Sequence, residues 1–104
     1  MKLDILAIGA HPDDVELGCS GTLIKHLKNG LKVGIIDLTR GELATRGTTE
    51  TRDEETKNAT KILGVDVREN LGLKDGFFEN SEGNRIALIK KIREYQPNIV
   101  ITNA

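Results

Sequence analysis

The sequence contains few aromatic residues and only one cysteine. Aromatic residues make up 3% of the chain, and tryptophan is absent. So few aromatic side chains argue against a platform on which nucleic-acid bases or sugar rings stack. The single cysteine, Cys19, cannot form a disulfide within the chain and is typical of a reducing compartment. We therefore expect a cytoplasmic protein.

The sequence also lacks an excess of charge of either sign and any long hydrophobic run. Lys and Arg together number 15 and Asp and Glu 16, which gives a formal net charge of -1. No basic surplus is present to bind nucleic acid or an anionic membrane surface. The apolar runs have the length of strands, and Asp4 interrupts the first one, so we expect neither a transmembrane helix nor a signal peptide. Oligomeric state is not determined by the sequence, and a homo-oligomer is compatible with it.

What the sequence does contain is typical of one small folded domain. Its 104 residues are 38% hydrophobic and 30% charged. Apolar strand-like runs alternate with segments of helical periodicity. The expected strands are 3–9, 33–38, 65–73 and 98–102, and the expected helices are 15–28, 52–63 and 84–96. This alternation predicts a three-layer α/β/α fold around a parallel sheet with right-handed crossovers.

Helix boundaries and helix faces are predicted from local signals. Thr51-Arg52-Asp53-Glu54 has the pattern of a capping box, and Asn84 can cap the last helix. Asn29-Gly30, Gly64 and Pro97 are expected to end the three helices. The predicted apolar faces are Leu17, Leu23, Ile24 and Leu27 in the first helix, and Ile86, Ile89 and Ile92 in the last.

The first strand is followed directly by a group of polar residues, His11-Pro12-Asp13-Asp14. In a doubly wound sheet the strand at 98–102 lies beside the first strand, and ligands bind in the crevice at their carboxyl ends. Zn²⁺ accepts imidazole nitrogen and carboxylate oxygen, and a further carboxylate can take a proton from water. The alternative is that one aspartate only caps the helix and that His11 has no special role. Spacing alone leaves both interpretations open.

The motifs resemble those of a known family. The run from Gly9 to Gly18, followed by Gly21-Thr22-Leu23, resembles the opening signature of the LmbE-like (PIG-L) superfamily of zinc-dependent N-deacetylases, which have a Rossmann-like core. The region from Asp37 to Arg52 is similar to the branch that deacetylates N-acetylglucosaminyl-malate in bacillithiol biosynthesis.

This resemblance implies a role for each matching residue. His11 and Asp14 would bind zinc, and Asp13 would be the general base that takes a proton from the attacking water. Arg52 matches an arginine of the substrate pocket, where it would hold a carboxylate such as that of malate. Substrate contacts are also expected, with less support, from Glu42, Arg46 and Asp75. Structural alternatives stay open: Arg52 can be a solvated residue after the helix cap, Arg46 is about as compatible with no functional role as with one, and Asp75-Gly76 is also a turn signal.

The resemblance also implies that these 104 residues are the N-terminal part of the enzyme. The third zinc ligand of the family is a later histidine, which we expect beyond Ala104; His26 is expected to be a surface residue. We accordingly expect the isolated chain to be inactive and its last strand to form an exposed apolar edge. A nucleotide-binding module is the remaining alternative, although the first strand-helix turn lacks both Gly-x-Gly-x-x-Gly and a Walker lysine.

Overall fold

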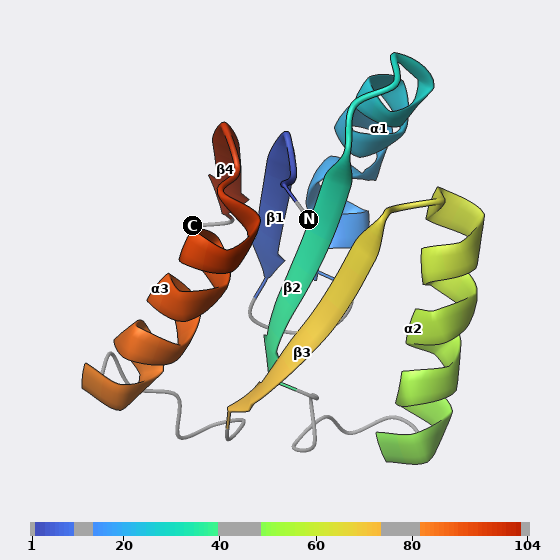
Figure 1. Cartoon of the computed structure of the whole chain (residues 1–104). Coiled ribbons are helices and arrows are strands. Elements are labelled where there is room, and N and C mark those ends of the chain that lie inside the picture. The colour runs from blue at the N-terminus through green and yellow to red at the C-terminus, as the bar shows by residue number, and fades with distance from the viewer. Residues whose placement is uncertain (1, 10–13, 40–48, 74–81, 103–104) are drawn as a thin grey trace.

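The computed structural model describes residues 2–9, 14–39, 49–73 and 82–102 of the chain. Strands and helices alternate along it, as the sequence predicts (Figure 1). The elements are β1 (Ile5–Gly9), α1 (Asp14–Lys28), β2 (Val33–Thr39), α2 (Thr49–Leu63), β3 (Val67–Leu73), α3 (Glu82–Tyr95) and β4 (Ile99–Thr102).

The four strands form one parallel sheet in the order β3-β2-β1-β4. Ile5 of β1 is in register with Val33 of β2 on one side and with Ile99 of β4 on the other. The predicted neighbourhood of the first and fourth strands is therefore confirmed. The chain proceeds outward from β1 to β3 and then returns to the other side of β1, so the strand order reverses between β1 and β4. In open α/β sheets, ligands bind at this kind of switch point.

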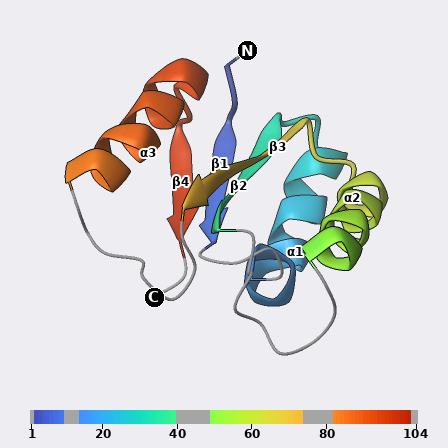
Figure 2. The same ribbon diagram turned by 90° about the horizontal axis from the view of Figure 1, so that it is seen from below.

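Helices cover both faces of the sheet, and a separate apolar cluster lies on each face. Figure 2 shows α1 and α2 on one side of the sheet and α3 on the other. Successive residues of a strand point to opposite faces, so the continuous apolar runs of β1 and β2 supply both clusters. The α1 side contains Ile5, Ala7, Val15, Leu23, Val33 and Ile35. The α3 side contains Leu3, Leu6, Ile8, Ile36 and Tyr95, with Leu88 and Ile92 packed against them.

The helix ends agree with the stop signals in the sequence. Gly30 has a φ of 82° and Gly64 a φ of 74°, a left-handed conformation that glycine adopts without a Cβ clash. The amide of Gly64 donates to the carbonyl oxygen of Thr60 at 3.0 Å, which satisfies an otherwise unpaired carbonyl at the end of α2. Gln96, with a φ of 44°, ends α3 immediately before Pro97.

Two predicted helix starts were wrong. α2 begins at Thr49 and α3 at Glu82, so Thr51 and Asn84 lie inside helices and not at their caps. Each helix includes an additional glutamate in its first turn, Glu50 in α2 and Glu82 in α3. Acidic residues there are stabilised by the positive end of the helix dipole, which favours the longer helices.

The predicted apolar face of α3 was only partly right. Ile86 and Ile89 are 45% and 44% exposed. The side of α3 that contacts the sheet presents Leu88, Ile92 and Tyr95, which have the spacing of one helical stripe. In α1, Leu23 is fully buried and Leu27 packs against the core, but Ile24 is 37% exposed. Ile86 and Ile89 satisfied the helical periodicity as well as Ile92 does, but the stripe that faces the sheet is set by tertiary packing.

β4 forms one edge of the sheet, and its side chains are poorly covered. Ile99 is 53% exposed and Val100 42% exposed. The prediction of an exposed apolar edge at this strand is therefore confirmed. Within the described ranges, no helix is long and apolar enough to cross a membrane.

Candidate functional site

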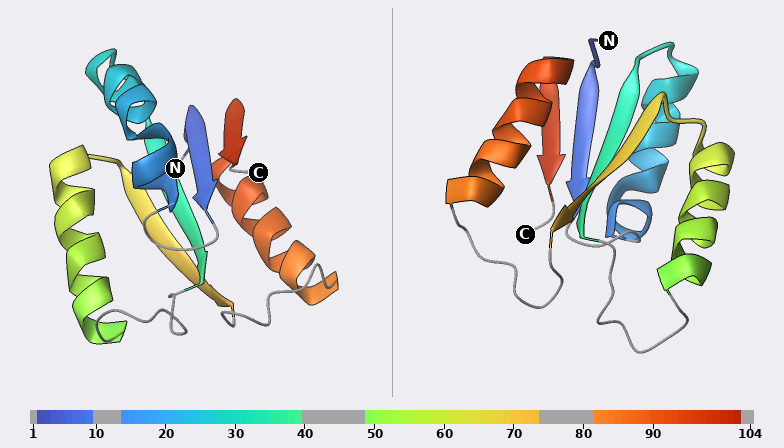
Figure 3. Two further views of the ribbon diagram at one scale, coloured as in Figure 1. Left: turned by 180° about the vertical axis from the view of Figure 1, so that it is seen from behind. Right: turned by 60° about the horizontal axis from the view of Figure 1, so that its bottom comes forward.

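The candidate site lies at the edge of the sheet where all four strands end, which we call the carboxyl edge. Its strand ends are Gly9, Thr39, Leu73 and Thr102. The register pairs Gly9 with Asp37, Thr39 with Leu73, and Ile8 with Thr102, so these ends lie next to one another. α1 and α2 start from the same edge and run back along the sheet (Figure 3). Their positive N-terminal ends therefore lie at this edge.

Most of the predicted site residues lie outside the described residues. In sequence, His11 and Asp13 follow β1, Glu42 and Arg46 follow β2, and Asp75 follows β3. Each of the five thus follows, in sequence, a strand that ends at the carboxyl edge. Their roles stay predictions.

Asp14 and Arg52 are described only as backbone positions. Asp14 is the first residue of α1, where the helix dipole stabilises an ionised carboxylate. That position suits a metal ligand and a helix cap equally well, so the two interpretations of Asp14 remain open. Arg52 is in the first turn of α2, at the carboxyl-edge end of that helix.

His26 is not near the carboxyl edge. It lies in the last turn of α1, about 18 Å along the helix axis from Asp14 at 1.5 Å per residue. Its backbone carbonyl accepts hydrogen bonds from the amides of Asn29 and Leu31. Within the part of the chain that the structure describes, no group of three or more His, Cys, Asp or Glu side chains could hold a metal ion.

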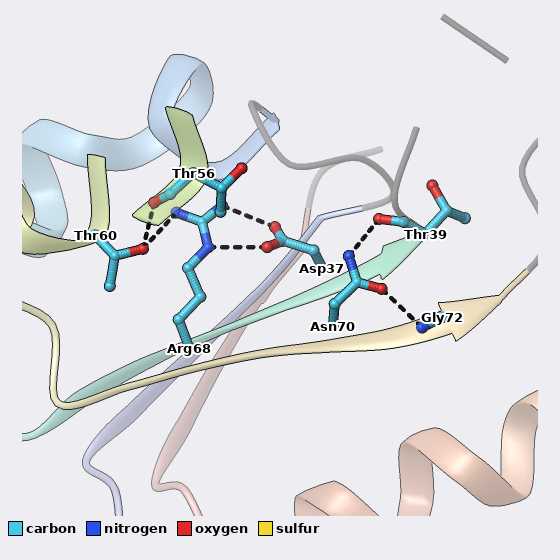
Figure 4. A network of polar contacts seen from close by, with 7 residues as sticks. All are labelled: Asp37, Thr39, Thr56, Thr60, Arg68, Asn70 and Gly72. Atoms are coloured by element: carbon cyan, nitrogen blue, oxygen red, sulfur yellow. Dashed lines mark hydrogen bonds and ion pairs between the residues drawn. The ribbon is translucent and has the colours of Figure 1, made fainter. Parts of the chain in front are cut away.

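A buried ion pair joins β2 and β3 close to the carboxyl edge. The Arg68 Nε and Nη2 atoms donate to the two carboxylate oxygens of Asp37, at 2.8 and 3.0 Å (Figure 4). The side chains are 6% and 2% exposed. A bidentate arginine–carboxylate contact fixes the geometry of both groups. Here its two hydrogen bonds also compensate for the free-energy cost of removing both charges from water.

The same arginine reaches α2. Arg68 Nη1 lies 3.5 Å from Thr60 Oγ1, and the Thr60 hydroxyl donates to the carbonyl oxygen of Thr56 at 2.7 Å. Because the single hydroxyl proton of Thr60 goes to Thr56, its oxygen is left to accept from the guanidinium. In Figure 4, Arg68 lies between Asp37 and Thr60.

Asn70 fixes the last residue of β2. Its Nδ2 donates to the carbonyl oxygen of Thr39 at 2.7 Å, and its Oδ1 accepts from the Gly72 amide at 2.7 Å. The register between β2 and β3 shifts between Asp37 and Thr39, and Gly72 has a φ of 69°. This irregularity is a bulge, a feature that commonly redirects a strand next to a binding site.

No functional role was expected for Asp37, Arg68 or Asn70 from the sequence. A signal was present, because Asp37 interrupts an apolar run that predicts a fully buried strand. A buried carboxylate needs a partner. Sequence alone did not indicate which cation would supply it, because Arg68 lies in a different, weakly predicted strand.

On the opposite face of β3, Glu69 binds two residues of α3. Both the Tyr95 hydroxyl and Lys91 Nζ donate to its carboxylate, the latter at 2.9 Å. Burial acts to raise the pKa of Glu69, but these two hydrogen bonds and the charge of Lys91 outweigh it, so the pKa lies below its ordinary value. The hydrogen bond to Glu69 raises the pKa of Tyr95 and likewise that of Lys91. This cluster joins β3 to α3 and lies on the sheet face opposite the Asp37–Arg68 pair.

The sequence matches one family along almost its whole length. The family, described as PIG-L, GlcNAc-PI de-N-acetylase, matches residues 6–104. An uncharacterized deacetylase of Escherichia coli (strain K12), YaiS, is 42% identical over an aligned length of 80 residues, and the alignment covers 68% of this chain and 43% of that protein. The diacetylchitobiose deacetylase of Thermococcus kodakarensis is 31% identical, covering 93% of this chain and 39% of that protein.

Two further similarities concern a possible substrate branch and the fold. A probable N-acetyl-alpha-D-glucosaminyl L-malate deacetylase 2 of Bacillus anthracis is 29% identical over 94% of this chain and 49% of its own length. The crystal structure of the conserved protein TT1542 from Thermus thermophilus superposes with a TM-score of 0.89 at 46% identity, covering 94% of this chain and 44% of that one. The chain thus spans less than half the length of these proteins.

Proposed function

The chain belongs to the PIG-L family of GlcNAc-PI de-N-acetylases, and we propose that the protein which contains it is a zinc-dependent N-deacetylase of an N-acetylglucosaminyl conjugate. One observation carries the proposal. The family match includes His11-Pro12-Asp13-Asp14, and this run joins the carboxyl end of the central strand β1 to the start of α1. Residues at such a position in an α/β sheet are well placed to bind ligands.

The donor atoms of this run fit zinc. His11 supplies an imidazole nitrogen and Asp14 a carboxylate oxygen, both ordinary zinc ligands, and the N-terminal end of α1 favours the ionised form of Asp14. Catalytic zinc sites use three protein ligands, and we propose that the third is a histidine outside these 104 residues, as the resemblance to the family implies. When bound, the ion would polarise the acetamide carbonyl and make water at the site more acidic.

The other residues of the run and of the carboxyl edge carry out the remaining steps. Asp13 accepts a proton from the attacking water and passes it to the departing amine, which releases acetate and the free amino sugar. Arg52 holds an anionic group of the substrate, Glu42 and Asp75 contact the sugar end, and Arg46 is a further substrate contact. These assignments derive from the resemblance to the family's motifs.

We propose N-acetylglucosaminyl-malate as the substrate, which would place the enzyme in bacillithiol biosynthesis. The Bacillus anthracis relative supports this choice, and so does the presence of an arginine at position 52, whose planar guanidinium matches the carboxylates of malate. The Thermococcus kodakarensis relative is described by a neutral substrate, diacetylchitobiose. The two candidate substrates therefore differ in charge, because N-acetylglucosaminyl-malate carries carboxylates and diacetylchitobiose does not.

The test is a substrate comparison with the intact protein. Acetate release should be faster, at equal concentration, from N-acetylglucosaminyl-malate than from diacetylchitobiose, and Arg52→Gln should reduce only the preference for malate. Faster turnover of diacetylchitobiose would refute the malate assignment and leave the deacetylase assignment intact. Absence of acetate from every N-acetylglucosamine conjugate would refute both.

A further inference from the structure

α2 has little apolar surface with which to pack against the rest of the molecule. Its sequence, TETRDEETKNATKIL, has no apolar side chain before Ala59. Of the two large apolar residues that follow, Ile62 is 85% exposed and Leu63 packs against the core. Helices in proteins are normally held by an apolar stripe. For α2 this stripe is confined to the end of the helix far from the carboxyl edge.

Arg68 provides a polar attachment for this helix. Its guanidinium contacts Asp37 of β2 and Thr60 of α2, while its own backbone belongs to β3. One buried, planar group therefore joins three elements. Since Asp37 binds two of its nitrogens, the direction in which the third nitrogen points toward Thr60 is also fixed.

Arg52 lies on the stripe of α2 that this attachment orients. Arg52, Thr56 and Thr60 follow one another at four-residue intervals, which places their backbone positions along one side of the helix. Arg52 lies about 12 Å from Thr60 along the axis, toward the carboxyl edge. A small rotation or shift of α2 at Thr60 would therefore displace Arg52.

We propose that Arg68 is a positioning residue for substrate binding: by joining Asp37 to Thr60 it sets where α2, and with it Arg52, lies relative to the carboxyl edge. This inference rests on the proposed substrate-binding role of Arg52. The attachment involves β2, β3 and α2, whereas His11, Asp13 and Asp14 all follow β1. Loss of the attachment should therefore weaken substrate binding and leave the chemical step unchanged.

Thr60→Val is the main test, because it keeps the shape of the side chain and removes the oxygen that accepts from Arg68. In the intact enzyme we expect KM to rise roughly three- to tenfold, the range that loss of one hydrogen bond gives, with kcat unchanged. Thr60→Ser keeps the hydroxyl and should behave as wild type. Arg68→Lys keeps the positive charge but loses the bidentate contact with Asp37, so it should raise KM by a similar factor.

Glu69→Gln is the matched control. It changes the neighbouring position of β3, where the side chain faces α3 and not α2. This variant should change stability without changing KM. An unchanged KM in both Thr60→Val and Arg68→Lys would overturn the proposal, as would an equal rise of KM in Glu69→Gln.

Amide hydrogen exchange separates failure of this inference from failure of the proposed function. Thr60→Val should speed exchange in α2 relative to α1, whether or not the protein is a deacetylase. If wild type releases no acetate but this selective effect appears, the proposed function fails and the attachment of α2 by Arg68 is supported. If exchange in α2 is unchanged, the attachment is refuted.

Discussion

At the scale of single residues, Asp13 and Asp14 are adjacent in sequence and yet are assigned different tasks. Asp14 begins α1, a position at which the helix dipole favours the ionised form of a carboxylate, the form that binds a metal. Asp13 precedes the helix and is proposed to exchange a proton. The two assignments can be separated because one concerns metal affinity and the other the rate of the chemical step.

Asp13→Asn should therefore reduce kcat by about two to four orders of magnitude, the usual effect of losing a general base, while the zinc content stays as in wild type. Asp14→Asn should lower the zinc content. Metal analysis and acetate release measured on the same samples check both. Zinc loss in Asp13→Asn with retention in Asp14→Asn would reverse the two roles.

The buried pair of Asp37 and Arg68 makes a second prediction at this scale. Removing one partner leaves a charge buried without its main counter-ion, so Arg68→Met should lower the free energy of unfolding by about 3–5 kcal/mol. Urea denaturation measures this loss. The double variant Arg68→Met with Asp37→Leu should recover part of it, and a double variant less stable than Arg68→Met would contradict the account.

At the scale of elements, the ends of the helices depend on backbone conformation that the sequence indicates. Gly30, Gly64 and Pro97 predicted three ends correctly, because glycine readily adopts the left-handed conformation that ends a helix and proline cannot continue one, and neither property depends on packing. The starts of α2 and α3 were missed because Thr51 and Asn84 were only two of several residues able to begin a helix. The face of α3 was misjudged because Ile86 and Leu88 both fit a helical stripe, and only the sheet beneath decides between them.

Gly64 allows a direct test of this argument. An alanine there would have open space around its Cβ but would be forced into a φ of 74°. Gly64→Ala should therefore destabilise the protein by roughly 1–2 kcal/mol. Gly21→Ala, in the interior of α1 and also in open space, should instead stabilise it by about 0.5–1 kcal/mol. Thermal unfolding of both variants distinguishes backbone strain from crowding, since crowding would predict no effect at Gly64.

The contact between β3 and α3 predicts a pH dependence of stability. The pKa of Glu69 is lowered from 4.5. Its contribution to the free energy of unfolding is therefore present above about pH 4.5 and is lost as the pH falls through the lower, folded-state pKa. The pKa of Tyr95 is raised from 10.0, so its contribution is present below pH 10 and is lost as the pH rises toward the folded-state pKa. The difference in unfolding free energy between wild type and Glu69→Gln should therefore be greatest between these limits. A difference independent of pH would contradict this prediction.

At the scale of the whole molecule, the sheet and its layers were predictable from the sequence. The polar contacts of Arg68 with Asp37 and Thr60 were not. Alternating strands and helices with apolar strands such as Ile5–Gly9 predict a parallel sheet with helices on both faces, and in a doubly wound sheet β4 lies beside β1. The Arg68 contacts depend on which residues of β2, β3 and α2 meet in space. No local sequence pattern predicts which residues of these three elements come into contact.

The proposed zinc site also requires residues from outside these 104, for reasons that concern the molecule as a whole. The switch point lies between β1 and β4, and the chain spans 39–49% of the length of the three relatives. The proposed zinc ligands within the chain, His11 and Asp14, are two, whereas a catalytic zinc site uses three. We therefore expect these 104 residues alone to bind zinc more weakly than the intact protein and to release no acetate.

The most direct test of the account is zinc content and acetate release from the intact protein and its His11→Ala variant, with an N-acetylglucosaminyl conjugate as substrate. The wild-type protein should contain one zinc ion per chain and release acetate, and His11→Ala should lose both the zinc and the activity. A wild-type protein that contains no zinc, together with a His11→Ala variant that deacetylates at the wild-type rate, would contradict it.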